Sequence, residues 1–273
     1  MGKSKVIMKT KDIFELNKRN FKAYLRKPLR PKSEKIVTNS IQWVGHATTI
    51  INMEGKIILT DPVTKHLGYM KRLVKPSVNL KNLKIDYILI THGHMDHLDY
   101  SVLAGLDKDA TVISSKGVKK TLKIIGFKKI NILSENEAYK DENIEIDAIR
   151  ANHNGKRYYF FGYKDSNSYL IKGSKKSVLF AGDTAYTTVY KNIKADAAIM
   201  PVGCYKPDEF LKMHCSPEQA FKMFKMMKAK QMIPIHYKTY ILAQDDDNET
   251  LKRLNTINDG SIKIVDVGQT IVF

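Results

Sequence analysis

Residues 91–99 of this chain, THGHMDHLD, place metal-binding side chains directly after an apolar run at residues 85–90. The segment contains three histidines and two carboxylates, which are His92, His94, Asp96, His97 and Asp99. Imidazole and carboxylate groups together suit first-row divalent cations, and several in one loop fill most of a coordination shell. A polar surface loop with chance histidines is disfavoured, because the whole chain has only eight His. The segment therefore predicts a strand followed by a metal-binding loop.

The length and composition favour one large folded domain. A chain of 273 residues, with 43% hydrophobic and 9% aromatic residues, can bury a substantial core. No linker divides it convincingly, so we expect a basic N-terminal helical arm over residues 1–35 and a single domain over residues 36–273. The net charge of +18 would attract anionic partners. The basic residues are spread along the whole chain, so this charge alone does not identify a partner.

The two cysteines, Cys204 and Cys215, form neither a disulfide framework nor a CxxC site. We expect both to be buried thiols in a cytoplasmic protein. The N-terminal residues are too polar for a signal peptide, and no run approaches the roughly 18 apolar residues of a membrane span.

The N-terminal arm contains a helical segment at residues 12–25, which Pro28 and Pro31 end. Its apolar residues have mixed spacing and are Ile13, Phe14, Leu16, Phe21, Tyr24 and Leu25. We favour a helix packed on the domain, because an amphipathic membrane-surface arm needs a cleaner apolar face. Peripheral contact with a membrane stays open.

From residue 41 the pattern is one of short strands alternating with helices, which indicates an α/β (α+β) fold. A hairpin turns at Glu54 and Gly55. Further strands are predicted at residues 85–90, 110–114, 130–133, 142–153, 158–163, 168–173, 177–183, 195–203 and 232–236. Helices are predicted from about residue 99, at residues 116–126, and at residues 216–230, where Ser216 and Pro217 form a strong start.

Isolated polar residues follow several of these strands. His153, Asp183 and His236 each come directly after an apolar strand, as does the metal loop. Strand ends of this kind place their side chains at one edge of a sheet. We therefore expect these residues and the metal loop to form one site.

The number of candidate ligands suits two metal ions. We expect His92, His94 and His153 to bind one ion, Asp96, His97 and His236 to bind the other, and Asp183 to bridge both. A bridging carboxylate holds two cations roughly 3.5–4 Å apart, with a shared position for an attacking hydroxide. The absence of a GxSxG motif and of a P-loop removes the obvious rival chemistries.

Other polar residues have less specific interpretations. Asp61 ends a strand and is expected to hold a ligand histidine by its second ring nitrogen. His46 is equally a turn histidine or a functional residue. Asp99 is expected to cap the helix that follows it. His66 lies in the basic segment at residues 64–84, which is expected to border the site, and is more typical of a surface residue.

The HGHMDH motif, with His153, Asp183 and His236, resembles the metallo-β-lactamase superfamily. This resemblance implies a four-layer αβ/βα sandwich with a metal site at one sheet edge. The segments WVGHATTII, FAGDTAY and HCSPEQA are similar to the branch of N-acylphosphatidylethanolamine-hydrolysing phospholipase D and ascorbate-6-phosphate lactonase. This branch implies two zinc ions, or manganese in lactonase-like members. Iron is a further alternative for the two divalent ions. The branch also implies that His214 approaches the active site. We expect Asp96, Asp183 and His214 to be the catalytic residues.

The chain also departs from its branch. Asn154 follows His153 where the phospholipases have tryptophan-rich segments, and Trp43 is the only tryptophan. Lipid specificity therefore does not transfer directly. Asp183 stands where the main class of zinc β-lactamases uses cysteine, which argues against antibiotic hydrolysis.

We therefore expect a binuclear metal-dependent hydrolase in which a metal-bridging hydroxide attacks a phosphodiester or related ester. The substrate would be an anionic small molecule or a lipid, such as an N-acylphosphatidylethanolamine. A lactonase acting on a phosphorylated sugar lactone is one alternative. An RNA-directed nuclease is less favoured, because no RNA-binding arm is visible. A non-enzymatic metal-dependent binding protein is the third alternative.

Overall fold

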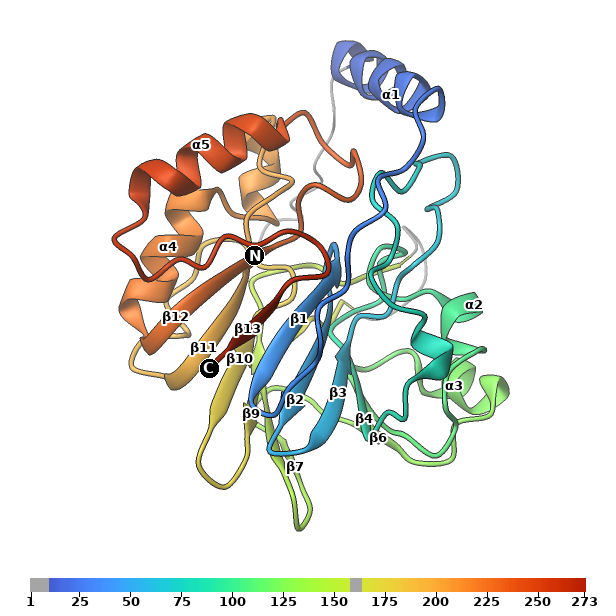
Figure 1. The fold of residues 1–273 in the computed structure, drawn as a ribbon, viewed down its shortest axis with the longest axis vertical. Helices are drawn as coiled ribbons and strands as arrows, with labels where there is room; N and C mark the ends of the chain where they lie inside the picture. The colour runs from blue at the N-terminus through green and yellow to red at the C-terminus, as the bar shows by residue number, and fades with distance from the viewer. Residues whose placement is uncertain (1–9, 158–163) are drawn as a thin grey trace.

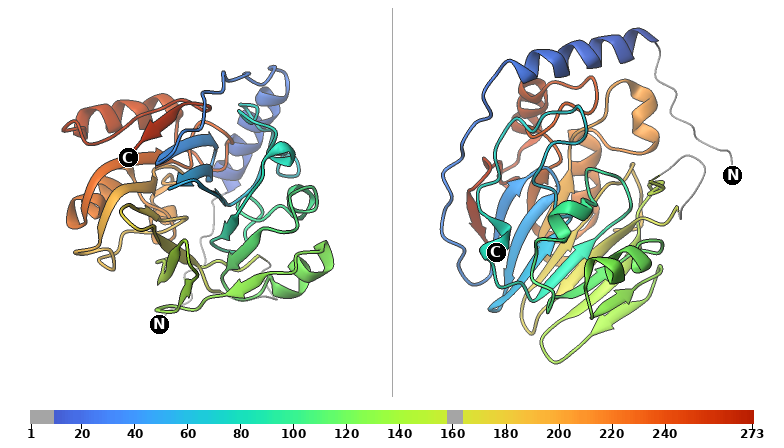
Figure 2. Two further views of the ribbon diagram at one scale, coloured as in Figure 1. Left: turned by 60° about the horizontal axis from the view of Figure 1, so that its bottom comes forward. Right: turned by 90° about the vertical axis from the view of Figure 1, so that its right-hand side faces the viewer.

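A computed structural model describes residues 10–157 and 164–273, and in these ranges the chain forms two β-sheets that face each other. Helices cover the outer faces of both sheets (Figures 1 and 2). The predicted four-layer αβ/βα sandwich is confirmed. The strand predicted at residues 158–163 lies outside the described residues.

The first sheet holds the N-terminal strands. Its strands are β1 (Ser40–Gly45), β2 (Thr48–Met53), β3 (Lys56–Thr60), β4 (Tyr87–Ile90), β5 (Thr111–Ser114), β6 (Ile130–Ile132) and β13 (Thr270–Val272). They lie in the order β13-β1-β2-β3-β4-β5-β6. The strands from β3 to β6 run parallel, and β4 is buried along its whole length. This burial explains its continuous apolar sequence.

The second sheet is built from the later part of the chain. Its strands are β7 (Ala138–Lys140), β8 (Glu145–Arg150), β9 (Asn167–Lys172), β10 (Ser177–Phe180), β11 (Lys194–Pro201) and β12 (Lys228–Ile235). They lie in the order β12-β11-β10-β9-β8-β7, with β10, β11 and β12 parallel. The short strand β7 was not predicted, because its three residues carry no buried apolar pattern.

The helices lie outside the sheets. They are α1 (Thr10–Tyr24), α2 (Tyr100–Leu103), α3 (Lys119–Ile125), α4 (Pro217–Met226) and α5 (Asp247–Ile257), with 3-10 turns at Leu80–Asn82 and Asp208–Lys212. Figure 1 shows α4 and α5 beside β12, and α2 and α3 beyond the opposite sheet. No helix in the described part of the chain is long and apolar enough to cross a membrane.

Two hydrophobic cores hold these layers together. The larger core joins both sheets to α4 and includes Trp43, Phe180 and Met223. The second core packs the first sheet against α2 and α3 and includes Leu103 and Leu122. The site therefore rests on a rigid scaffold, since most of its strands are buried on both faces.

Side-chain caps set where two helices begin. Asp99 accepts hydrogen bonds from the backbone N–H groups of Ser101 and Val102 at 2.9 and 3.2 Å, so the predicted cap of α2 is confirmed. Ser216 and Gln219 form a reciprocal capping box at the start of α4. The predicted start at residue 216 is therefore correct.

The predicted end of that helix is wrong. We expected a helix to residue 230, but α4 ends at Met226 and β12 begins at Lys228. Lys228 and Ala229 pair with Lys194 and Ala195 of β11. The ladder with β11 outweighs the helix propensity of these lysines and alanine, because local propensity is small compared with sheet pairing.

Candidate metal centre

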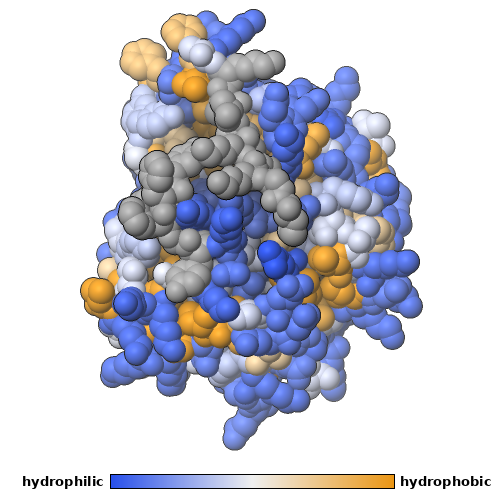
Figure 3. Space-filling view, turned by 180° about the vertical axis from the view of Figure 1, so that it is seen from behind, coloured by the Kyte–Doolittle hydropathy of each residue, from blue (hydrophilic) through white to orange (hydrophobic). Residues whose placement is uncertain are grey.

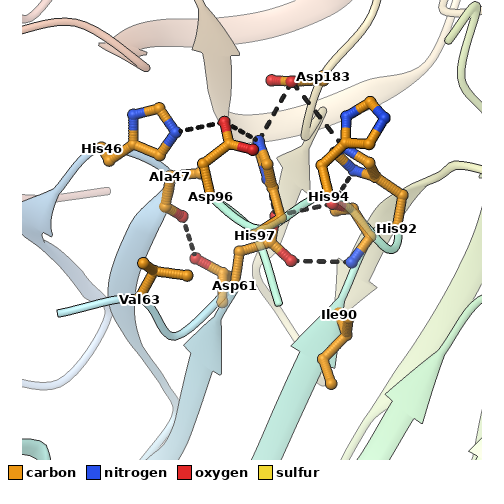
Figure 4. A network of polar contacts seen from close by, with 12 residues as sticks. His46, Ala47, Asp61, Val63, Ile90, His92, His94, Asp96, His97 and Asp183 are labelled. Carbon is orange, nitrogen blue, oxygen red and sulfur yellow. Dashed lines mark hydrogen bonds and ion pairs between the residues drawn. The ribbon is translucent and has the colours of Figure 1, made fainter. Parts of the chain in front are cut away.

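The predicted ligands lie together at one edge of the sandwich. The metal loop follows β4, and His153, Asp183 and His236 follow β8, β10 and β12. Their rings and carboxylates point toward one another from the two sheets, as Figure 4 shows for the metal loop and Asp183. The geometry divides them into two groups that share a border.

The first group contains His92, His94, His153 and Asp183, whose candidate ligand atoms all lie within 4.8 Å of one another. His153 Nε2 lies 3.2 Å from His94 Nδ1. Asp183 Oδ2 lies 4.0 Å from His92 Nε2 and 3.9 Å from His153 Nε2. Three imidazole nitrogens and one carboxylate oxygen form the donor set of a tetrahedral zinc-type site.

The second group contains Asp96, His97 and His236, as predicted, and also His46. His97 Nε2 lies 3.3 Å from His236 Nε2, and Asp96 Oδ2 lies 3.4 Å from each of these nitrogens. This group therefore also brings imidazole and carboxylate donors to one point.

Asp183 stands between the two groups. Its Oδ2 lies 3.1 Å from His97 Nε2 and its Oδ1 lies 3.0 Å from His236 Nε2. Neither oxygen has a hydrogen-bond partner with acceptable geometry in the described part of the chain, although the side chain is buried. A buried carboxylate without hydrogen bonds is costly, so a cation is the partner that its surroundings call for.

Asp61 orients His97 directly and His92 through Thr91. Its Oδ2 lies 2.7 Å from His97 Nδ1, and its two oxygens accept hydrogen bonds from the backbone N–H and the hydroxyl of Thr91. The Thr91 hydroxyl also lies 2.9 Å from His92 Nδ1. The predicted contact of Asp61 with the second ring nitrogen of a histidine is found at His97, and the Thr91 hydroxyl links Asp61 to His92 of the first group. In both rings the other nitrogen, Nε2, is left for a cation.

His153 is oriented by the backbone. Its Nδ1 lies 2.7 Å from the carbonyl oxygen of Met213, which leaves Nε2 facing the first group. The sequence showed no sign of this contact, because it depends on a main-chain oxygen.

The structure resolves the open question about His46. This buried residue lies with its Nε2 3.0 Å from Asp96 Oδ2, and its ring centroid is 4.0 Å from that of His236. Burial and the nearby His236 lower the pKa of His46 to about 3. His46 thus belongs to the site. The sequence signal was the same as for the predicted ligands, a polar residue directly after an apolar strand.

The charge of the cluster favours cations. Burial opposes ionisation of Asp96 and Asp183, but the surrounding histidines outweigh it and hold the pKa of both carboxyls well below the usual range. Burial likewise lowers the pKa of His97 and His236, yet Asp183 and the other acidic groups raise it well above the usual value. The carboxylates therefore draw positive charge into the site, and divalent cations can take the place of protons on the rings.

Several residues at this edge have a backbone conformation that only a few residue types adopt readily. The φ angles of His46, Asp61, Cys204 and His236 are positive, at 55°, 33°, 62° and 69°. Such strain persists only where packing imposes it, and it clusters at functional sites. Here it turns four side chains at strand ends toward one centre.

His214 lies beside the metal ligands, as the sequence resemblance implied. Its Nδ1 is 3.6 Å from Asp183 Oδ2 and its side chain is 12% exposed, so the ring borders the opening of the site. Burial lowers the pKa of His214 to about 4. Nδ1 has no hydrogen-bond partner among the described residues.

The two cysteines are buried thiols, as predicted. Cys204 lies close to His214 and His236, and burial raises its pKa to about 12, which keeps the thiol protonated. The Cys215 thiol donates to the carbonyl oxygen of Pro201 at 3.2 Å. Cys215 therefore has a structural role.

The basic segment at residues 64–84 contributes less to the site than we expected. Arg72 is buried, and its guanidinium donates to the carbonyl oxygens of Val44, Val63 and Val74. This arginine cannot face a substrate. His66 is exposed and accepts a hydrogen bond from the Arg72 N–H, which agrees with its interpretation as a surface residue.

Comparisons with known proteins agree with this geometry. A family model described as the beta-lactamase superfamily domain matches residues 56–237. The chain is 30% identical to an N-acyl-phosphatidylethanolamine-hydrolyzing phospholipase D of Caenorhabditis elegans, over 83% of this chain and 74% of the relative.

Solved structures share the fold. A metallo hydrolase from the archaeon Ignicoccus hospitalis has a TM-score of 0.67 at 22% identity, covering 86% of this chain and 97% of its own. An isothiocyanate hydrolase from Delia radicum gut bacteria has a TM-score of 0.69 at 18% identity, covering 86% and 99%. At these identities the likeness concerns the fold alone.

Proposed function

This chain belongs to the metallo-β-lactamase superfamily of metal-dependent hydrolases, and from that premise we propose that it is a binuclear phosphodiesterase. His92, His94 and His153 would hold one ion, Asp96, His97 and His236 would hold the other, and Asp183 would contact both. Zinc is the favoured metal, because neutral imidazole with carboxylate suits it. Manganese and iron are the alternatives.

The position of Asp183 carries the proposal. Its Oδ2 lies 3.1 Å from His97 and its Oδ1 lies 3.0 Å from His236, both of which belong to the second group. The same Oδ2 also faces His92 and His153 of the first group. A carboxylate shared between two donor sets is the arrangement that holds two cations close together. A site for one ion would not need the second set of three ligands.

The chemistry divides between the ions and the side chains. A pair of divalent cations supplies Lewis acidity and lowers the pKa of bound water. Asp61 and Thr91 keep the ligand rings of His92 and His97 in place, which limits reorganisation during the reaction. His214 offers an imidazole nitrogen to a substrate oxygen at the opening. Asp96 is 17% exposed on its side chain, so substrate approaches from the side of these two residues.

Two observations favour a phosphodiester as the substrate. One relative is an N-acyl-phosphatidylethanolamine-hydrolyzing phospholipase D, and the scissile group of such a substrate is a phosphodiester. The net charge of +18 attracts anionic molecules. We therefore propose a phospholipid of this class, or a related phosphodiester.

Chelation and one substitution test the proposal. We expect dialysis against a chelator to abolish hydrolysis of bis(4-nitrophenyl) phosphate, and addition of zinc, manganese or iron to restore it. We expect Asp183→Asn to lose activity and to retain less metal by elemental analysis. Asp99→Asn is the matched control, because Asp99 caps α2 and asparagine also caps helices. Full activity of the chelated protein or of Asp183→Asn would refute a metal-dependent mechanism.

The same assay separates the alternative functions. Turnover of a phosphorylated sugar lactone without turnover of phosphodiesters would identify a lactonase. Steeply salt-dependent binding and cleavage of RNA would identify a nuclease. Metal binding without turnover of any phosphodiester, lactone or RNA would indicate a binding protein.

A further inference from the structure

The helix α1 and the turn directly after it expose large apolar side chains. Phe14, Phe21 and Leu25 are 66%, 68% and 76% exposed, and Ile13 is 46% exposed. Phe14, Phe21 and Leu25 have the i, i+7, i+11 spacing, so Phe14 and Phe21 share one face of α1, and Leu25 lies in the turn that directly follows the helix. Figure 3 shows apolar side chains gathered at the end of the molecule where α1 lies.

A different face of α1 attaches it to the domain. Leu16, Asn20 and Ala23 are buried. Asn20 donates to the carbonyl oxygen of Ile241 at 3.0 Å, and Arg19 donates to the carbonyl oxygens of Ala243 and Asp245. The apolar residues have mixed spacing in the sequence because they lie on two faces of the helix. One face packs on the domain and the other is exposed. The sequence-based preference for a packed helix was correct but described only the first face.

A basic stripe flanks the exposed apolar row. Lys11, Lys18 and Lys22 have the same i, i+7, i+11 spacing, displaced by three residues, so their stripe is adjacent to the phenylalanines. All three lysines are exposed. Residues 10–30 hold seven basic and two acidic side chains. The whole segment thus has a strong positive charge next to an apolar surface.

We propose that this face of α1 docks the protein on the surface of an anionic phospholipid bilayer. Large apolar side chains beside lysines are the composition of helices that lie in the membrane interface, with rings among the acyl chains and ammonium groups at the headgroups. A protein partner fits less well, because lysine is depleted in protein–protein interfaces. The positive charge beside the apolar face thus favours an anionic lipid surface over a protein partner.

The attachment of α1 places this surface near the metal centre. The residues that Arg19 and Asn20 contact lie in the segment that directly follows His236. Arg19 and His236 also line the same small cavity, together with Cys204 and Tyr240. Docking through α1 therefore brings the edge of the sandwich that carries the metal ligands toward the bilayer. The docking itself does not depend on the proposed reaction.

Vesicle co-sedimentation of the full chain tests the proposal. We expect binding to vesicles of phosphatidylcholine with phosphatidylglycerol to be about tenfold or more stronger than to phosphatidylcholine alone. The double variant Phe14→Ser with Phe21→Ser should bind about tenfold more weakly, since each ring buries apolar surface in the interface. Ile124→Ser is the control, because Ile124 is 85% exposed on α3.

Charge reversal provides the second arm of the experiment. Lys18→Glu with Lys22→Glu should weaken binding to anionic vesicles by about tenfold or more. Lys119→Glu with Lys120→Glu makes the same change of net charge on α3 and should leave most of the binding intact. Equal losses in both pairs would show unspecific attraction and overturn a docking face on α1.

Two further results would overturn the proposal. One is the absence of wild-type binding to either vesicle. The other is a wild-type dimer in light scattering that becomes a monomer in the double variant Phe14→Ser with Phe21→Ser. In that case a second copy of the chain would occupy the exposed face of α1. Asp183→Asn should sediment with vesicles like the wild type. Vesicle binding is therefore measured independently of catalysis, so a failure of the proposed reaction can be told apart from a failure of docking.

Discussion

Asp61 and His97 are in contact through Oδ2 and Nδ1 at 2.7 Å, and both side chains are completely buried. The same carboxylate accepts from Thr91, whose hydroxyl contacts His92. One residue outside the two candidate groups therefore sets the orientation of a histidine in each of them. Contacts of this kind raise the basicity of the ligand nitrogen and fix the ring.

We predict that Asp61→Asn weakens metal binding by about 10- to 100-fold, because an amide neither carries the charge nor accepts from both neighbours. Competition with a chelator series, read by elemental analysis, measures the affinity. Thr91→Val removes the hydroxyl contacts with Asp61 and His92 but keeps the contact of Asp61 with His97, so it should have a smaller effect. Unchanged metal retention in Asp61→Asn would show that the ligand rings are held by packing alone.

His46→Ala should reduce the affinity of the second metal group by roughly tenfold, because Asp96 loses the partner that lies 3.0 Å from its Oδ2. His46→Gln can still donate to Asp96 and should restore part of the affinity. The first group lacks this contact, so its metal should be retained in both variants. Equal affinity in the Ala and Gln variants would contradict a hydrogen-bonding role.

Trp43 offers a direct reporter for that measurement. It is the only tryptophan, its Nε1 donates to the His46 carbonyl oxygen at 2.8 Å, and its ring stacks on Tyr237 with centroids 5.2 Å apart. Because Tyr237 follows His236 in the chain, metal binding should change the tryptophan emission. A titration that alters elemental occupancy without changing emission would show that the reporter is uncoupled.

His214→Ala should lower kcat by about a hundredfold while metal content stays the same, because the ring borders the opening without belonging to the ligand sets. His66→Ala is the matched control, since His66 is exposed and its Nδ1 accepts from the Arg72 N–H. Loss of metal in His214→Ala would instead place this residue among the ligands.

Glu54 joins the two sheets and should make stability depend on acid pH. Its oxygens accept from the N–H groups of Ser174, Lys175 and Lys176 and from the Ser174 hydroxyl. Hydrogen bonding to Ser174 and Lys175 lowers the pKa of Glu54 from 4.5 to about 2. A lowered folded-state pKa contributes stability that is complete above about pH 4.5 and is lost as the pH falls toward 2.

We therefore predict that Glu54→Gln costs about 1 kcal/mol at neutral pH, a value reduced by solvent screening. The difference from wild type should shrink below pH 4.5, the ordinary pKa of this side chain. Urea unfolding at several pH values measures it. Glu142→Gln is the control, because Glu142 is exposed. A difference that stays constant across this range would exclude the charge of Glu54 as its cause.

The sequence by itself determined the candidate ligands of the site and the order of most of the elements that carry them. Ligand residue types and their places after apolar strands are local properties, so the metal loop, His153, Asp183 and His236 were all predictable. Local patterns also indicated the caps at Asp99 and Ser216. The end of α4 was not predictable, because pairing with β11 decides it.

Only the tertiary structure decided which residues meet across the sheets. The contact of His46 with Asp96, the link from Asp61 through Thr91 to His92, and the main-chain partner of His153 join segments far apart in the chain. The two faces of α1 likewise became distinct only when Leu16 and Asn20 were seen to pack on the domain. Residue types and periodicity are local, whereas contacts and exposure depend on how distant segments pack.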